Sequence, residues 1–321
     1  MVNIMLTYRC NRNCDYCFAK GQEKKFPEEM SMENFSKLLE WLKKINRGVL
    51  WVSLLGGEPT QHSRIKEILE LLKEARNERI FTRLFTNGIF SHTLIKSLDE
   101  TIVNYIVNYN PLDQYTPKEK KLLLQNLKIL KRLNKKIALS YTINEKNLDY
   151  TFILKAAKAF NASIRFDFSH PSSDKSNIFF TIQKDKEIAP IVVKFIKEAV
   201  KQGIDLGMDC CVPLCIFKKE DLKFIRAHVK HMIGVCGPAM DINPDLSMYN
   251  CLAYNLKIKN VLEFSSLKEI EEYFLKRTRK LRWEVPTLPE CRNCEYWLTK
   301  QCQGGCLGLK VMAQNGIKSF S

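Results

Sequence analysis

The distribution of cysteine is the feature that most constrains this chain. Three of its 12 cysteines lie within residues 10–17, none lies between residues 18 and 209, and the other nine lie between residues 210 and 306. In a reducing compartment, closely spaced cysteines are typical of metal or redox sites rather than of disulfides. The pattern therefore predicts two separate metal-binding regions, one near the start of the chain and one near its end.

The overall composition points to a globular protein without a membrane segment. The 321 residues contain no run of 18 or more apolar residues, and the first residues show neither a basic leader nor a small-residue cleavage site. We therefore expect a cytoplasmic protein. The formal net charge of +16 would suit nucleic acid or another acidic partner. We attribute this charge to a lysine-rich composition spread over solvated helix faces, and we do not expect a nucleic-acid partner.

Apolar runs and amphipathic segments alternate along the first two hundred residues. The apolar runs predict strands at residues 3–7, 49–55, 80–86, 102–109, 137–143 and 163–168. Helical spacing predicts helices at residues 33–45, 63–75, 92–98, 117–133, 150–160 and 189–201.

Six such units in order make parallel strands with right-handed crossovers, too few to close an eight-stranded barrel. The predicted fold is α/β, a partial (β/α)6 TIM-like barrel followed by a small cysteine-rich domain. The alternation of apolar runs and amphipathic segments ends between residues 180 and 205. We therefore place the barrel at 1–200 and the second domain at 201–321.

The first cysteine cluster directly follows the first expected strand, on the face where barrel active sites are built. Cys10, Cys14 and Cys17 have the spacing C-x₃-C-x₂-C. Three thiolates would leave one iron of a [4Fe–4S] cubane without a protein ligand, and that iron can chelate S-adenosylmethionine (SAM). A zinc site that lacks its fourth ligand is the alternative.

These residues resemble the radical SAM superfamily, whose signature is C-x₃-C-x-aromatic-C, with Tyr16 in the aromatic position. The segment Leu55-Gly56-Gly57-Glu58-Pro59 ends the second expected strand and matches the family's GGEP segment, which contacts the amino group of SAM. The resemblance implies that the three cysteines hold the SAM-binding cluster. It also implies reductive cleavage of SAM to a 5′-deoxyadenosyl radical, which abstracts a hydrogen atom from the substrate.

Further contacts are predicted from the positions of polar residues at strand ends, which line the active face of a barrel. The resemblance suggests SAM or substrate contacts at Asn87, Ser140, Thr142 and Arg165. Strand-end residues that merely face water are the alternative for each. No catalytic acid or base is evident, and the polar group that a radical reaction needs has three candidates, Asn108, Tyr109 and His170.

The C-terminal cysteines resemble the SPASM or Twitch domains of peptide-modifying radical SAM enzymes, which hold auxiliary [4Fe–4S] clusters. The spacing is Cys236-x₁₄-Cys251, then Cys291-x₂-Cys294-x₇-Cys302-x₃-Cys306. The third interval is x₇ rather than x₅, and no cysteine follows Cys306. A Cys₄ zinc ribbon is the alternative.

By analogy, the nearer of two clusters takes Cys215, Cys236, Cys251 and Cys306. Cys210 and Cys211 are rivals for the place of Cys215. The outer cluster then keeps only Cys291, Cys294 and Cys302, so the number of auxiliary clusters stays at one or two.

Three functions are compatible with these features. The first is a peptide- or protein-modifying enzyme that forms a thioether, a carbon–carbon cross-link, an epimer or an oxidised residue. It would use a flavodoxin- or ferredoxin-type reductant, and any leader-binding module would be a separate protein. The second is a small-molecule dehydrogenase or bond-forming enzyme of a biosynthetic pathway. The third, a non-enzymatic nucleic-acid-binding protein, is supported only by the basic charge.

Overall fold

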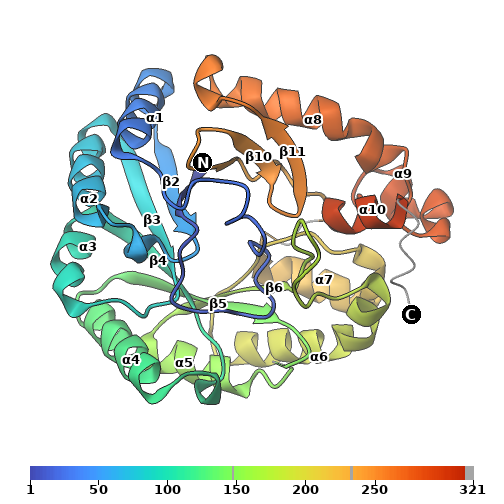
Figure 1. The fold of residues 1–321 in the computed structure, drawn as a ribbon. Coiled ribbons are helices and arrows are strands. Elements are labelled where there is room, and N and C mark those ends of the chain that lie inside the picture. Colours follow the sequence, from blue (N-terminus) through green and yellow to red (C-terminus); the bar gives the residue numbers. More distant parts are fainter. Residues whose placement is uncertain (147, 232–233, 315–321) are drawn as a thin grey trace.

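The computed structural model describes residues 1–146, 148–231 and 234–314, and its centre is a curved parallel sheet (Figure 1). The sheet begins with β1 (Val2–Thr7), β2 (Leu50–Gly56), β3 (Ile80–Thr86), β4 (Ile102–Asn108), β5 (Lys136–Ile143) and β6 (Ser163–Phe168). Each of these strands pairs in parallel with the next. The predicted α/β fold with a partial (β/α)6 barrel is confirmed.

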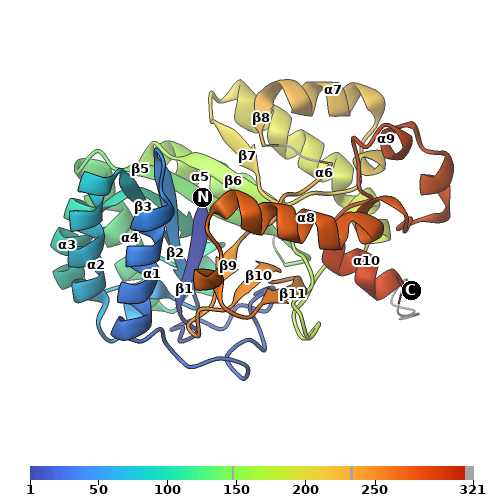
Figure 2. The same ribbon diagram turned by 90° about the horizontal axis from the view of Figure 1, so that it is seen from above.

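Helices cover the outer face of the sheet, as Figures 1 and 2 show. They are α1 (Met32–Ile45), α2 (Ile65–Glu74), α3 (Ile95–Thr101), α4 (Pro117–Arg132), α5 (Thr151–Phe160) and α6 (Ile182–Lys201). Their buried faces carry apolar residues at helical spacing, and these side chains form one continuous core with the strands.

The pleat of β5 and β6 decides which of their residues face the barrel interior. Tyr141 and Phe166 point outward, because their rings lie edge-on to Phe195 of α6 at centroid distances of 5.7 and 5.2 Å. Successive side chains of a strand point to opposite faces. Ser140, Thr142 and Arg165 therefore point into the barrel.

The sheet continues beyond the six expected strands at both of its edges. Next to β6 lie β7 (Leu206–Met208) and β8 (Val229–Lys230), and on the other side of β1 lie β9 (Asp241–Ile242), β10 (Met248–Cys251) and β11 (Tyr254–Ile258). Sequence reasoning missed them, because segments of two to five residues show too little periodicity. One sheet thus crosses the boundary proposed near residue 200, and that boundary stays a prediction.

The rest of the cysteine-rich region is helical and irregular. It contains α7 (Lys219–His228), α8 (Leu267–Trp283), α9 (Glu295–Leu298) and α10 (Leu307–Gln314). In Figures 1 and 2, α8 and α10 lie beside β10 and β11 at the edge of the barrel. The fold therefore places the late cysteines next to the barrel.

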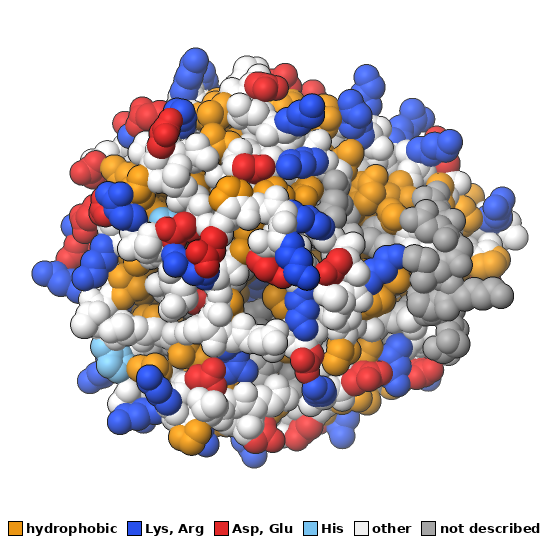
Figure 3. All heavy atoms as spheres, in the orientation of Figure 1, with side chains coloured by type: hydrophobic (Ala, Val, Ile, Leu, Met, Phe, Trp, Pro, Cys, Tyr) orange, Lys and Arg blue, Asp and Glu red, His pale blue; other side chains and the backbone are white. Residues whose placement is uncertain are grey.

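Figure 3 shows the charges on the face viewed in Figure 1. Lysine and arginine side chains are interspersed with acidic ones over this face and do not gather in one basic patch. The view thus agrees with a solvated, lysine-rich surface here. Among the helices in the described ranges, none is long and apolar enough to cross a membrane.

Phe195 gives a test of the core between α6 and the sheet. We expect Phe195→Ala to lower the free energy of unfolding by about 3–5 kcal/mol, because the ring is fully buried against Tyr141 and Phe166. Ile191→Ala, at an exposed position of the same helix, should change it by less than about 0.5 kcal/mol. Denaturant titration of both variants measures the difference, and equal stabilities would contradict this packing.

Candidate active site

The first cysteine cluster lies in a long loop that follows β1. The loop's two ends are held together by backbone hydrogen bonds, from Tyr8 N–H to the carbonyl of Glu28 (2.8 Å) and from Met30 N–H to the carbonyl of Leu6 (2.8 Å). Figure 1 shows the loop crossing the open end of the barrel. The structure therefore brings the loop to the C-terminal ends of the parallel strands, as expected.

The three thiols of this loop are free and partly accessible. The sulfur of Cys10 accepts from the backbone N–H of Arg12 (3.4 Å) and lies 3.9 Å from Nδ2 of Asn87. Burial raises the pKa of Cys10, and it raises the pKa of Cys17 to about 11. Such thiols lose their protons when a metal binds, and N–H groups aimed at sulfur stabilise the bound thiolate. The donor set fits an iron–sulfur cluster.

The two glycines of the GGEP segment allow β2 to end against the start of this loop. Gly56 has φ of +146°, and a Cβ there would lie 2.0 Å from the carbonyl oxygen of Thr7. A Cβ on Gly57 would lie 2.3 Å from the carbonyl oxygen of Arg9. Instead, Gly57 N–H donates to Thr7 (2.7 Å) and Glu58 N–H donates to Arg9 (2.8 Å). The glycines thus couple the segment to the cysteine loop.

Glu58 fastens the ends of β2 and β3 together. Its carboxylate is fully buried and accepts from the hydroxyls of Thr60 (2.7 Å) and Thr86 (2.8 Å) and from Asn87 N–H (2.7 Å). Burial raises the pKa of Glu58, and these hydrogen bonds act in the opposite direction. Glu58 therefore positions the GGEP segment and the loop that carries Asn87. This loop in turn contacts the cysteine loop, because Asn87 Nδ2 donates to Asn11 Oδ1 (2.6 Å).

Tyr16 links the cysteine loop to the end of β4. Its hydroxyl donates to Oδ1 of Asn110 (2.7 Å) and lies 3.1 Å from Oδ1 of Asn108. A cavity of about 220 Å³ opens beside it and is also lined by Cys14 and Asn144. The structure thus places Tyr16 and Cys14 on one polar cavity at the barrel mouth.

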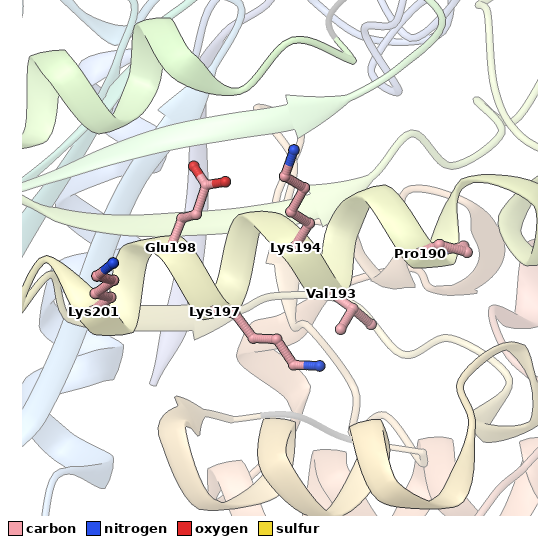
Figure 4. Close-up of a pocket in the computed structure, with 6 residues that line it drawn as sticks. All are labelled: Pro190, Val193, Lys194, Lys197, Glu198 and Lys201. Carbon is pink, nitrogen blue, oxygen red and sulfur yellow. The ribbon is translucent and has the colours of Figure 1, made fainter.

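A larger hollow of about 380 Å³ lies elsewhere, along α6 (Figure 4). Its lining includes Lys194, Lys197 and Glu198. These side chains belong to the helical layer outside the sheet, so this hollow is not part of the candidate site.

Charged groups gather inside the barrel where β6 meets β7. Arg165 pairs with Asp209, and its guanidinium lies over the ring of Phe85, 4.5 Å from the centroid. Carboxylate oxygens of Asp167 and Asp209 and the sulfur of Cys210 lie within 4.8 Å of one another. Burial, together with the charge of Asp209, raises the pKa of Asp167 to about 7. This cluster joins the barrel interior to the second cysteine region.

The structure separates the other candidate residues of the barrel. Ser140 and Thr142 point into the barrel, and Thr142 donates to Asp167. Arg165 is engaged by Asp209, so a contact with SAM stays a prediction for it. Tyr109 is not in the barrel interior, because its buried ring stacks on Phe152 of α5.

His170 and Asn108 remain as candidate polar groups. Burial lowers the pKa of His170 to about 4, so its imidazole is neutral at physiological pH and offers no charge to a carboxylate. Asn108 keeps its place at the barrel mouth beside Tyr16.

The later cysteines form two groups, and within each group the thiols influence one another's pKa. The inner group comprises Cys210, Cys211, Cys236, Cys251 and Cys306. A hydrogen bond from Cys211 lowers the pKa of Cys236 to about 6, and burial raises that of Cys306 to about 12. Both Cys211 and Cys236 also accept from Nε2 of Gln303, at 3.3 and 3.1 Å.

The outer group comprises Cys215, Cys291, Cys294 and Cys302. Burial raises the pKa of Cys215, and the neighbouring thiolates of Cys302, Cys291 and Cys294 raise it further. Cys215 thus has the outer cysteines as its electrostatic neighbours, and its expected place in the nearer cluster stays a prediction. Cys215 sits in the short 3₁₀ turn Leu214–Ile216, which tertiary packing brings beside the outer cysteines. No spacing rule in the sequence could have shown this.

A buried donor without a partner shows that the inner group fits an anion. The guanidinium of Arg282 is 2% exposed, and its Nη2 has no hydrogen-bond partner among the described residues. Its Nη1 donates to Gln303 Oε1 (2.5 Å) and lies 3.9 Å from the sulfur of Cys236. An anionic iron–sulfur cluster on these thiols would supply the charge and the acceptor that Arg282 lacks. The inner group therefore fits an auxiliary cluster.

Comparison with known proteins agrees with this geometry. Residues 4–111 match the family model of the Radical SAM superfamily. Among curated proteins, radical SAM cyclopropyl synthase TigE from Paramaledivibacter caminithermalis is 25% identical over 96% of this chain and 67% of its own length. GTP 3′,8-cyclase from Campylobacter jejuni is 23% identical over 88% of this chain and 92% of its own. Fe-coproporphyrin III synthase from Methanosarcina barkeri is 28% identical, but the match spans only 37% of that protein.

Solved structures resemble nearly the whole chain. The structure of anSMEcpe with bound AdoMet superposes with a TM-score of 0.71 at 17% identity, covering 98% of this chain and 94% of the other. Streptococcus suis SuiB bound to S-adenosylmethionine gives 0.66 at 16% identity, covering 95% and 72%. The similarity in fold thus extends through the cysteine-rich region.

Residues 4–111 therefore match the Radical SAM superfamily, and the resemblance of the chain to radical SAM enzymes with SPASM- or Twitch-type auxiliary domains is confirmed. The cofactors of the chain are a [4Fe–4S] cluster and SAM, and the late cysteines fit auxiliary clusters.

Glu58 gives a test of how the site is assembled. In Glu58→Gln, an amide donor replaces one buried acceptor, so a hydroxyl or N–H group loses its partner. We expect a loss of about 1–3 kcal/mol in stability and weaker SAM binding. Thermal unfolding and isothermal titration with SAM measure the two effects. Glu67→Gln, which changes an exposed carboxylate on α2, should behave like the parent, and identical behaviour of both variants would refute the role of Glu58.

Proposed function

We propose that this enzyme modifies a peptide or protein substrate. The observation that carries the proposal is the second cysteine region itself, which is built onto both edges of the barrel sheet and holds two groups of thiols. SuiB has been solved bound to precursor peptide SuiA, and anSMEcpe with AdoMet and the Kp18Cys peptide. These two proteins share the fold of both regions of this chain.

In the proposed active site, Cys10, Cys14 and Cys17 hold the SAM-binding cluster. The bound cluster and SAM supply the radical that abstracts hydrogen. Tyr16, the segment Gly56–Pro59 and Asn87 form the SAM side of the mouth, since hydrogen bonds tie each of them to neighbouring strand ends or to the cysteine loop. Ser140, Thr142 and Arg165 line the barrel interior, where they would orient SAM or the substrate.

We further propose that the late cysteines hold two auxiliary clusters. Cys236, Cys251 and Cys306 would bind the inner cluster, with either Cys210 or Cys211 as its fourth ligand. Cys291, Cys294 and Cys302 would bind the outer cluster, and Cys215 would complete it. Each proposed cluster would then have four thiolate ligands, although no cysteine follows Cys306.

The enzyme would work in the cytoplasm with a flavodoxin- or ferredoxin-type reductant, and a separate protein would present any leader peptide. A small-molecule substrate is the second candidate. Its support is the match to GTP 3′,8-cyclase, which covers 92% of that protein.

The substrate class can be tested by co-expression with the short peptides encoded beside the gene. We expect the core of one peptide to change mass, or to take up deuterium from D₂O in the case of epimerisation. Mass spectrometry of the recovered peptides makes the measurement. Unmodified peptides together with turnover of a nucleotide or sugar would favour the small-molecule alternative.

Cys14→Ala tests the assignment of the SAM cluster. We expect this variant to form no 5′-deoxyadenosine from SAM with dithionite, because a cluster with two remaining loop thiolates is not retained. Its auxiliary iron should persist, which provides the internal control. Chromatography of the product and iron analysis report the two quantities, and continued SAM cleavage would overturn the assignment.

The auxiliary ligands are tested by iron content in the Cys10/Cys14/Cys17→Ala background. That parent should hold about 8 irons per chain, as two [4Fe–4S] clusters. Adding Cys215→Ala should remove the outer cluster, and adding Cys236→Ala should remove the inner one, each lowering iron to about 4 with loss of a different EPR signal. Full iron in the Cys215→Ala variant would show that this cysteine is not a ligand, and zinc in place of iron would refute the clusters.

A further inference from the structure

Two buried cations lie between the two groups of late cysteines. Lys310 is 0% exposed and Arg282 is 2% exposed. Within the described ranges, neither cation pairs with a carboxylate. Burying a charge without a counter-charge is costly, so an anion is expected nearby.

Lys310 reaches toward both groups. Its ammonium donates to the carbonyls of Gln303 (2.6 Å) and Arg282 (2.9 Å) and lies 4.3 Å from the centroid of the Trp297 ring. Burial lowers its pKa to about 8, and the thiolates of Cys291 and Cys302 in the outer group and of Cys211 in the inner group act against that shift. The ammonium is thus held by neutral groups within the electrostatic reach of both sets of sulfurs.

Gln303 and Arg282 extend the contact into the inner group. Gln303 follows Cys302 directly in the chain, and its amide donates to the sulfurs of Cys211 and Cys236. Its Oε1 accepts from Arg282, whose Nη1 also donates to the carbonyl of Cys236. Lys310, Gln303 and Arg282 therefore form one buried polar bridge from the outer cysteines to the inner ones.

We propose that the positive charges of Lys310 and Arg282 in this bridge compensate the negative charge of the two auxiliary clusters. Their reduction potentials are therefore higher than those of clusters without nearby cations. The inference rests on the proposed clusters. A [4Fe–4S] cluster with four thiolates is an anion and gains another negative charge on reduction, and net charge and hydrogen bonds to sulfur are among the factors that tune its potential. A fixed cation in a low-dielectric interior stabilises the reduced form more than the oxidised form. The bridge thus favours clusters that accept an electron.

The substitution that isolates charge is Lys310→Gln, because glutamine keeps an N–H donor for the two carbonyls and removes the positive charge. In the Cys10/Cys14/Cys17→Ala background, potentiometric titration followed by EPR should show lower midpoint potentials for the auxiliary clusters. Lys310→Arg should keep the parent values, since it keeps the charge. Lys300→Gln, which removes an exposed charge from the same region, should also keep them.

The outcomes separate the bridge from the clusters. Full iron content with unchanged potentials in Lys310→Gln would overturn the bridge and leave the clusters standing. If Lys310→Gln loses auxiliary iron while Lys310→Arg retains it, the charge is needed to hold the clusters, which supports the proposal. Loss of iron in both variants would show a packing role and overturn it. Absence of auxiliary iron in the parent would instead refute the proposed clusters.

Discussion

The architecture depends on the pairing of β1 on both of its sides. The strand hydrogen-bonds in parallel to β2 and to β9, and Asn3 Nδ2 reinforces the second contact by donating to Oδ1 of Asp241 (2.8 Å). β1 leads directly into the first cysteine loop, whereas β9 and β10 lead to Cys251. The pairing of β1 therefore positions the first cysteine loop and the strand that carries Cys251 within one sheet.

Close approach of backbone segments explains why glycines stand at the barrel mouth. Gly56 and Gly57 sit where a Cβ would overlap the carbonyl oxygens of Thr7 and Arg9. The carboxylate of Glu58 accepts hydrogen bonds from donors at the ends of two strands, so Glu58 holds the site together. The segment that resembles a SAM-binding motif is equally the joint between β2 and the cysteine loop.

Buried charges connect the two groups of cysteines in the C-terminal region. A buried arginine and a buried lysine are costly in a protein interior, and these two cations lack carboxylate partners within the described residues. Thiolates bound to iron would balance them. The same reasoning links the barrel to this region, since Cys210 of the inner group lies beside Asp167 near the end of β6 and Asp209 directly after β7.

The sequence alone determined the six βα units and the loop that carries Cys10, Cys14 and Cys17, because apolar periodicity and cysteine spacing are local properties. It also indicated the auxiliary domain from the spacing of Cys291 and Cys294. Only the tertiary structure showed that Cys215 neighbours the outer cysteines and that the ring of Tyr109 packs on Phe152 of α5. Those outcomes depend on which face of a strand points inward and on which distant turns meet, and contacts between segments far apart in the chain leave no periodic trace in the sequence.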